Sequence, residues 1–238
     1  MTQPNGLLAA GGDLTPATLI SAYAQGIFPW FDDDEEILWW TPCPRLVMRT
    51  SNVRISRSMR KHLRQSHCHL RYDSAFSEVI HHCATAARGG DVAGTWITED
   101  MQAAYQKLHE IGIAHSIEVY EGNQLIGGLY GILLGHMFFG ESMFSLCSNA
   151  SKVAFIALNR TCAGAGVNLI DCQVDNPHLS SLGATTMPRR DFEKHLRDAI
   201  KVDMTDILKD PHCLIPERRQ TLPERLRTSA PQLLEELL

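Results

Sequence analysis

Two polar residues at the end of an apolar segment have the types and the spacing to act on an amine. Asp171 and Gln173 lie in the segment 167–173, whose apolar residues predict a buried strand. Since side chains at positions i and i+2 of a strand point to the same face, the carboxylate and the amide are expected side by side, with Cys172 facing the other way. A carboxylate can orient an amine or take its proton, and an amide can fix its geometry. The alternative interpretation is that Asp171 only hydrogen-bonds a neighbouring loop.

Three further polar residues are candidates because each follows a predicted strand. Glu141 comes after the apolar run 137–140, where the alternative is an ordinary acid at a strand end in water. Asn176 is predicted to cap a short helix with Pro177 in its first turn. Asn176 and His178 could both support a site by hydrogen bonds, and His178, with a reference pKa of about 6.5, is a conceivable general base. A histidine at a helix start is more often structural, so we rank it as a supporting residue.

The elements that must position these residues alternate between strands and helices. Three consecutive strands are predicted over 115–120, 124–133 and 136–140. Helices are predicted at 16–25 with Thr15 as N-cap, at 58–65, 74–87 and 99–112, at 150–163 with Asn149 as N-cap, and at 190–200. Prolines break up the chain just before Arg45, which predicts a small N-terminal domain of residues 1–45 and a larger domain of residues 46–238.

The composition excludes several classes of protein. The 238 residues, 44% of them hydrophobic, can bury a substantial core, and no apolar stretch approaches the roughly 20 residues of a membrane helix. The first residues lack the pattern of a signal peptide, so we expect a cytoplasmic protein without a membrane partner. A net charge of -5 argues against general nucleic-acid coating, so any RNA contact must be a local patch. Two clusters of histidine and cysteine, 67–69 and 81–83, lack zinc spacing, and we expect no metal site.

Several ordered blocks resemble the leucyl/phenylalanyl-tRNA-protein transferase family. The resemblance covers roughly residues 3 to 195, and because the blocks follow the order of the family, coincidence is improbable. The blocks include Pro4-Asn5-Gly6-Leu7-Leu8-Ala9, Gly11-Gly12-Asp13-Leu14, Gly26-Ile27-Phe28-Pro29-Trp30-Phe31, Leu38-Trp39-Trp40, Ile55-Ser56-Arg57-Ser58-Met59, Gly94-Thr95-Trp96-Ile97-Thr98, His115-Ser116-Ile117-Glu118-Val119, Gly140-Glu141-Ser142-Met143-Phe144-Ser145, Asn149-Ala150-Ser151-Lys152, Leu169-Ile170-Asp171-Cys172-Gln173 and Ser181-Leu182-Gly183-Ala184.

The resemblance implies a fold and a reaction. The fold would be α+β, with a small N-terminal α/β domain packed on a larger acetyltransferase-like (GNAT) domain, whose mixed, mostly antiparallel sheet is flanked by helices. The reaction would transfer leucine, phenylalanine or methionine from an aminoacyl-tRNA to the N-terminal amine of a protein that begins with Arg or Lys, which would mark that protein for N-end rule degradation. Aminolysis of an activated ester needs neither ATP nor a metal, so no cofactor is expected. We expect a monomer by default.

The resemblance also assigns roles to residues. Asp171 and Gln173 would act on the acceptor amine, and Glu141 would hold the substrate amino group or the terminal ribose. The donor side chain needs an apolar pocket, for which the candidate walls are Leu129, Phe138, Met143 and Ile170. Trp30 and Trp96 are the preferred candidates to stack the terminal adenine. For each of these apolar residues the alternative is plain core packing.

Charged segments are the candidates for contacts outside the pocket. Basic residues with partly helical spacing could bind tRNA phosphates, where the alternative is a solvated helix face: Arg54, Arg57, Arg60, Lys61 and Arg64. The acidic run 32–36 or Glu118 could receive the basic residue of the acceptor.

Two other functions remain open from the sequence. A coenzyme-A-dependent N-acetyltransferase of the same fold would need a pyrophosphate loop that opens a helix, and its best match, residues 160–166, instead follows one. A non-catalytic adaptor for basic protein N-termini would need the acidic subsite but not Asp171 and Gln173.

Overall fold

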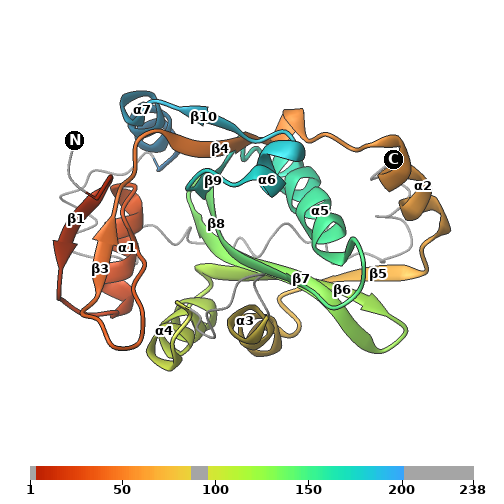
Figure 1. Cartoon of the computed structure of the whole chain (residues 1–238), viewed down its shortest axis with the longest axis horizontal. Helices are drawn as coiled ribbons and strands as arrows, with labels where there is room; N and C mark the ends of the chain where they lie inside the picture. Colours follow the sequence, from red (N-terminus) through yellow and green to blue (C-terminus); the bar gives the residue numbers. More distant parts are fainter. Residues whose placement is uncertain (1–3, 87–95, 201–238) are drawn as a thin grey trace.

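The computed structural model describes residues 4–86 and 96–200 and places two sheets side by side (Figure 1). A seven-stranded sheet has the strand order β10-β4-β9-β8-β7-β6-β5, and a three-stranded antiparallel sheet has the order β1-β3-β2. Within the large sheet β8 and β9 are parallel and the other neighbours are antiparallel. The expected α+β class with a mixed, mostly antiparallel sheet is therefore confirmed.

The strands of the large sheet are β4 (Arg45–Arg49), β5 (Cys68–Tyr72), β6 (Ala114–Glu121), β7 (Gln124–Leu134), β8 (Met137–Ser145), β9 (Leu169–Gln173) and β10 (Thr185–Met187). The small sheet consists of β1 (Leu7–Ala10), β2 (Phe28–Pro29) and β3 (Leu38–Trp40). The three consecutive strands predicted from alternation are β6, β7 and β8. Strand β8 continues five residues beyond its expected end at 140, so Glu141 lies within a strand and not at its end.

Helices cover both faces of the large sheet (Figure 1). On one face α5 (Ala150–Gly164) packs against β6, β7 and β8. On the other face lie α3 (Phe76–Thr85) and α4 (Glu99–Glu110). The remaining elements are α1 (Pro16–Ala24), α2 (Arg57–Gln65), α6 (Pro177–Ser181), α7 (Arg189–Ile200) and a short 3-10 helix, η1 (Thr50–Asn52).

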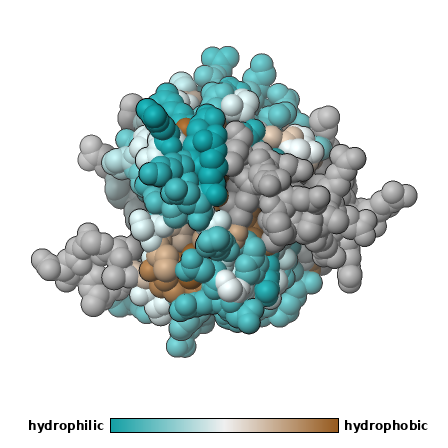
Figure 2. All heavy atoms as spheres, turned by 90° about the vertical axis from the view of Figure 1, so that its right-hand side faces the viewer, coloured by the Kyte–Doolittle hydropathy of each residue, from teal (hydrophilic) through white to brown (hydrophobic). Residues whose placement is uncertain are grey.

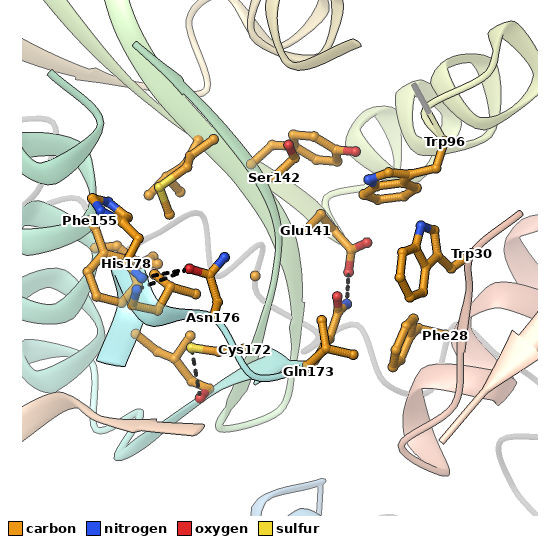
Figure 3. A pocket seen from close by; sticks show the side chains of 18 of the residues that line it. Phe28, Trp30, Trp96, Glu141, Ser142, Phe155, Cys172, Gln173, Asn176 and His178 are labelled. Atoms are coloured by element: carbon orange, nitrogen blue, oxygen red, sulfur yellow. Dashed lines mark hydrogen bonds between the residues drawn. The ribbon is translucent and has the colours of Figure 1, made fainter. Parts of the chain in front are cut away.

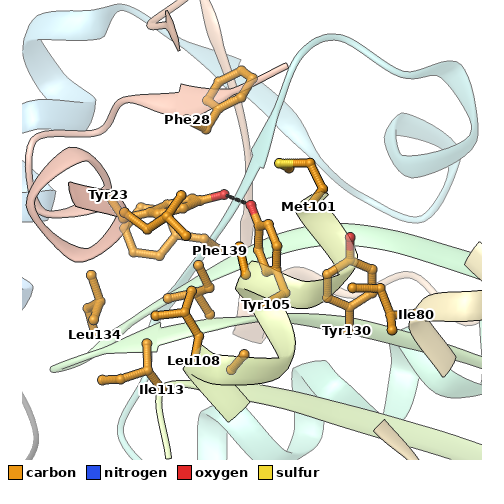
Figure 4. Packing of buried hydrophobic residues seen from close by; sticks show 14 of the residues in the cluster. Tyr23, Phe28, Ile80, Met101, Tyr105, Leu108, Ile113, Tyr130, Leu134 and Phe139 are labelled. Atoms are coloured by element: carbon orange, nitrogen blue, oxygen red, sulfur yellow. Dashed lines mark hydrogen bonds between the residues drawn. The ribbon is translucent and has the colours of Figure 1, made fainter. Parts of the chain in front are cut away.

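The N-terminal segment shares its core with the rest of the chain. Leu19 of α1 and Trp39 of β3 are buried in the same hydrophobic cluster as core residues of the large sheet. Figure 4 shows Tyr23 of α1 packed in this cluster beside Tyr105 of α4 and Phe139 of β8. The division at residue 45 thus stays a prediction, and it falls where β4 begins. The part of the larger domain beyond residue 200 lies outside the described residues.

Side-chain caps fix most of the predicted helix starts. Thr15, Thr98 and Asn176 each accept a hydrogen bond from a backbone N–H in the first turn of their helix, as expected. Asn149 occupies the N-cap position of α5 as predicted, but its side chain makes no cap hydrogen bond. That residue has a φ of 70°, and its amide oxygen accepts a hydrogen bond from the Lys152 ammonium at 3.3 Å instead of capping a backbone N–H.

No helix within residues 4–86 and 96–200 is long and apolar enough to cross a membrane.

Candidate active site

A cavity opens where β8 and β9 part. The two strands pair in parallel only from Met137 to Phe139 on β8, opposite Leu169 to Asp171 on β9. Beyond this point β8 pairs with β7 alone, and a cavity of about 430 Å³ lies between the diverging strands, α5 and α6 (Figure 3). Its walls are largely apolar and include Phe28, Trp30, Trp96, Leu129, Met143, Phe155, Leu158, Ile170 and Leu179. We call this space the β8–β9 cavity.

The polar end of the β8–β9 cavity centres on Glu141. Its Oε1 accepts hydrogen bonds from Gln173 Nε2 at 3.1 Å and from the Tyr23 hydroxyl at 2.8 Å, and its Oε2 accepts one from the Tyr105 hydroxyl at 3.0 Å. Burial raises the pKa of Glu141 to about 7, although hydrogen bonds from the two tyrosines and the charge of Arg45 oppose this rise. Glu141 is the only carboxyl group among the described residues that line the cavity.

Asp171 does not face the cavity. It is fully buried, and its carboxylate receives two hydrogen bonds from Arg45, from Nε at 2.8 Å and from the terminal nitrogen at 2.6 Å. The Arg45 guanidinium also lies over the rings of Phe28 and Phe192, at 4.8 Å and 4.7 Å from their centres. A bidentate pair of this kind occupies both oxygens of the carboxylate.

The expected alternation along β9 is wrong at its end. Both Cys172 and Gln173 line the cavity, whereas Asp171 points to Arg45. The reason is that Gln173 leaves the extended conformation with a φ of 64°, and its backbone N–H donates to Asp171 Oδ1 at 2.9 Å. Asp171 therefore fixes the turn that aims the Gln173 amide at Glu141. Burial raises the pKa of the Cys172 thiol, which keeps it protonated and unreactive.

Most of the predicted apolar and supporting residues do meet at this cavity. Those in its wall are Trp30, Trp96, Leu129, Met143, Ile170, Asn176 and His178. Phe138 is an exception, because its side chain is packed in the core with residues of α5 and β4 and does not line the cavity. It sits on the pleat opposite to Phe139, and both side chains fill the two cores of the sheet.

His178 lies at the far end of the cavity from Glu141 (Figure 3). Burial lowers the pKa of its imidazole, and the nearby charge of Lys152 lowers it further. The side chain of Asn176 is occupied as the cap of α6, where its Oδ1 accepts from the N–H of His178 at 2.9 Å. His178 and Asn176 therefore lie where they can form the wall of the cavity and support α6, and His178 is not beside Gln173, where a group that transfers a proton to or from the amine would be needed.

Sequence reasoning missed Arg45, Tyr23 and Tyr105. Arg45 was expected only to end the N-terminal unit, and its one local signal is a charged residue directly before an apolar strand. The two tyrosines carry no signal, because an aromatic residue at a helix position looks like ordinary core.

Two sequence models of the leucyl/phenylalanyl-tRNA protein transferase match the chain, the N-terminal domain at residues 12–43 and the main domain at residues 47–197. The chain belongs to this family. Proteins named leucyl/phenylalanyl-tRNA–protein transferase are similar to it over most of both lengths. The one from Xanthomonas euvesicatoria is 55% identical over 192 residues, covering 81% of this chain and 76% of its own. Those from Nitrosospira multiformis and Nitrosomonas europaea are 50% identical over 200 residues (84% and 85% of the two chains) and 53% identical over 196 residues (82% of each).

The part of the chain that matches the main transferase domain includes the predicted basic surface. Met59 and Leu63 bury one face of α2, and the five basic residues are all exposed: Arg54, Arg57, Arg60, Lys61 and Arg64. None of the five forms an ion pair with a described residue. The surface at this end of the molecule is hydrophilic in its upper part (Figure 2). The backbone N–H of Arg54 donates to Leu182 O at 2.8 Å, so this basic surface adjoins the segment that follows α6.

The two acidic candidates of the transferase chain differ in exposure. Glu118 is fully buried, and its carboxylate accepts hydrogen bonds from the hydroxyls of Ser116 at 2.6 Å and Ser74 at 2.9 Å. The prediction that it could receive a basic acceptor residue is therefore wrong. Residues 32–36 are exposed, and three of them line a second cavity of about 390 Å³ together with Asp100: Asp33, Glu35 and Glu36.

One observation bears on the acetyltransferase alternative and one on the histidine and cysteine clusters. Residues 160–166, the best match to a pyrophosphate loop, form the end of α5 and the turn after it, so their amides do not open a helix. No group of three His, Cys, Asp or Glu residues within the described segments could hold a metal ion.

Proposed function

We propose that the chain is an aminoacyltransferase that moves leucine or phenylalanine from a charged tRNA to the N-terminal α-amine of an acceptor protein. The observation that carries this proposal is the apolar β8–β9 cavity with a single carboxyl group at its polar end, in a chain that belongs to the transferase family. The reaction is aminolysis of an ester. It needs a neutral amine, donors for the carbonyl oxygen and correct alignment of both substrates.

The apolar part of the cavity is proposed to hold the donor side chain. Leu129, Met143 and Ile170 form walls without a hydrogen-bonding group, which favours leucine, phenylalanine and methionine over polar side chains. An apolar pocket discriminates by only about 1 to 3 kcal/mol per methylene, so more than one donor is expected to be accepted.

Trp30 and Trp96 are proposed to stack the terminal adenosine of the tRNA. Both line the cavity, and Trp30 is 42% exposed, so a base can reach its ring. Trp40 supports it, because its indole N–H donates to Trp30 O at 2.6 Å and the two rings are 5.9 Å apart.

Gln173 and Glu141 are proposed to contact the reacting groups, and Asp171 to position them. The Gln173 amide and the Glu141 carboxyl lie at the polar end of the cavity and are joined at 3.1 Å. Asp171 acts through the backbone of Gln173 and through Arg45, since its carboxylate has no free access to an amine. Of the two roles left open for Asp171 by the sequence, orienting the amine or taking its proton, this proposal assigns it an indirect positioning role.

The body of the tRNA is proposed to lie along α2. Exposed arginine and lysine side chains without acidic partners are free to neutralise phosphates, and Arg54 places them next to the α6 end of the cavity. The protein's overall charge of -5 makes this a local contact.

The acceptor's N-terminal Arg or Lys is proposed to bind the exposed acidic segment. Phe31 and Asp33 line the second cavity, and the preceding residue, Trp30, lines the β8–β9 cavity, so one short segment contributes to both spaces. Such acceptors fit a cytoplasmic role in marking proteins for N-end rule degradation, carried out by a monomer without cofactor.

Transfer of radiolabelled leucine from Leu-tRNA to short peptides tests this proposal. A peptide that begins with Arg is expected to be labelled, whereas one that begins with Ala or is acetylated is not. Labelling of no peptide would refute the transferase function. Tight binding of acetyl-coenzyme A would then favour the acetyltransferase. The adaptor would be favoured if the protein bound the Arg peptide without transferring leucine and if Gln173→Ala bound that peptide equally well.

A further inference from the structure

Three oxygen-bearing side chains close a ring at the polar end of the β8–β9 cavity. Tyr23 of α1 contacts Glu141 Oε1, and Tyr105 of α4 contacts Glu141 Oε2. The two tyrosine hydroxyls are also hydrogen-bonded to each other (Figure 4). Both tyrosines are completely buried, so water does not replace any of these contacts. The ring therefore contains three hydrogen bonds between three side chains.

The number of hydrogens in the ring depends on the protonation of Glu141. Each tyrosine hydroxyl carries one hydrogen, and an ionised carboxylate carries none. With Glu141 ionised, two hydrogens must serve three contacts, and one pair of oxygens faces each other without a hydrogen. With Glu141 protonated, each contact has one hydrogen. The ring is thus complete only with the acid form.

We propose that Glu141 is protonated in the resting site and that the Glu141–Tyr23–Tyr105 ring exchanges the one proton that aminoacyl transfer requires. Oε1 already accepts from Gln173, so the proton is placed on Oε2. In this acid form the contact that an ionised Oε2 would accept from Tyr105 reverses its direction. Oε2 donates to the Tyr105 hydroxyl, which donates to the Tyr23 hydroxyl, which donates to Oε1. This inference rests on the proposed transferase function and adds the group that carries its proton.

The proton balance of the transfer closes with this ring. The neutral acceptor amine attacks the ester carbonyl, a nitrogen–carbon bond forms, and the bond from carbon to the ribose oxygen breaks. The ribose oxygen keeps the electron pair and takes the proton of Glu141. The new ammonium-like nitrogen then gives a proton to the Glu141 carboxylate, which restores the ring. Glu141 is the catalytic residue in this step, and the tyrosines are positioning residues.

The charged groups around the ring are few. Arg45 and Asp171 are the charged neighbours whose effect reaches Glu141, and they act in opposite directions while paired with each other. Gln173 adds a neutral donor. The protonation of Glu141 is therefore governed by burial and by the ring itself.

Infrared difference spectra of wild type against Glu141→Gln test the ring without any substrate. We expect the carbonyl band of a protonated carboxylic acid at pH 6 and its loss at higher pH, with a midpoint of about 7. Absence of this band at pH 6 would overturn the proposal. Because no tRNA or peptide is present, this result is independent of whether the chain transfers leucine.

Removal of one hydroxyl distinguishes a ring from two independent donors. In the ionised state of Glu141, Tyr23→Phe or Tyr105→Phe removes one charge-assisted hydrogen bond. In the acid state, the same substitution removes two neutral hydrogen bonds. One charge-assisted hydrogen bond is about as strong as two neutral ones, so these two losses nearly cancel. The substitution also removes the repulsion between the two oxygens that face each other without a hydrogen when Glu141 is ionised. This stabilises the ionised state, so the ring predicts a lower titration midpoint for Glu141. Independent donors to a carboxylate predict a higher midpoint, and that result would overturn the ring. Tyr72→Phe is the control, because Tyr72 packs against the core cluster on the opposite face of the sheet and its hydroxyl contacts that of Thr161. This variant should leave the midpoint of Glu141 unchanged.

Single-turnover transfer at several pH values tests the catalytic step. We expect the wild-type rate to pass through a maximum between the pKa of Glu141 and that of the acceptor amine, about 7.7 to 8.0, because Glu141 must keep a proton while the amine must lose one. Glu141→Gln is expected to bind Leu-tRNA but lose transfer. Transfer by Glu141→Gln at the wild-type rate would overturn the role of Glu141, even if the infrared band were present.

Discussion

Replacing Arg45 by methionine should strongly destabilise the protein. Arg45 is 1% exposed and is the only ion-pair partner of the fully buried Asp171 among the described residues. Removal of one partner from a buried ion pair leaves an uncompensated charge, which costs about 3 to 5 kcal/mol. For a chain of this size that loss corresponds to a decrease in Tm of about 6 to 20 °C. Urea unfolding followed by circular dichroism measures the free energy, and calorimetry measures Tm.

Two further variants separate the lost ion pair from a general loss of packing. The double variant Arg45→Met with Asp171→Leu removes both charges, so it should recover much of the stability that Arg45→Met loses. Arg60→Met on the exposed face of α2 should change the free energy of unfolding by less than about 0.5 kcal/mol. A cost of less than about 1 kcal/mol for Arg45→Met, or a double variant as unstable as the sum of both single variants, would refute this role of the ion pair.

Three other results are expected. Glu141→Gln should gain stability relative to wild type by roughly 3 kcal/mol between pH 4.5 and 8. With a folded pKa of about 7, the unfolded chain loses the Glu141 proton over this range while the folded protein retains it, so wild type loses stability as pH rises toward 7. Equal pH dependence of the two proteins in urea unfolding would contradict this. Trp30→Ala should weaken Leu-tRNA binding by about 5- to 150-fold in a filter-binding assay, because the terminal adenine loses the ring on which it stacks. Unchanged binding would exclude the stacking role of Trp30. Arg60→Gln should reduce the slope of log affinity for Leu-tRNA against log salt concentration by about 0.7 to 0.9, because one phosphate contact is lost. Arg197→Gln on α7 is the control and should leave the slope unchanged. Equal slopes for wild type and Arg60→Gln would exclude a phosphate contact at Arg60.

Local patterns in the sequence predicted the elements around the site. The caps Thr15, Thr98 and Asn176 start helices because each has a side-chain oxygen next to the first free N–H groups. The alternation that predicted β6 and β7 reflects their pairing in an antiparallel hairpin. Strand β5 was not predicted, because His69 and Arg71 interrupt its apolar residues and only pairing with β6 keeps it extended.

The connections within the site could not be predicted from local patterns. Arg45 meets Asp171 across 126 residues, and Tyr23 meets Glu141 across 118 residues. No short-range spacing encodes such contacts, since they depend on how β4 pairs with β9 and how α1 packs beside α4. The i and i+2 rule failed at Gln173 for a related reason, because its left-handed conformation is stabilised by the Asp171 carboxylate.

Filling the β8–β9 cavity tests the central claim most directly. Leu129→Trp and Met143→Trp place an indole in the proposed donor pocket, whereas Leu146→Trp adds one at a position that is 56% exposed. Urea unfolding first verifies that each variant is folded, since overpacking costs about 1 to 3 kcal/mol. In single-turnover transfer of leucine from Leu-tRNA to a peptide that begins with Arg, we expect the two cavity variants to lose transfer while they still bind uncharged tRNA, and Leu146→Trp to transfer like wild type. Transfer by both folded cavity variants at the wild-type rate would contradict the claim that the donor side chain binds between β8 and β9.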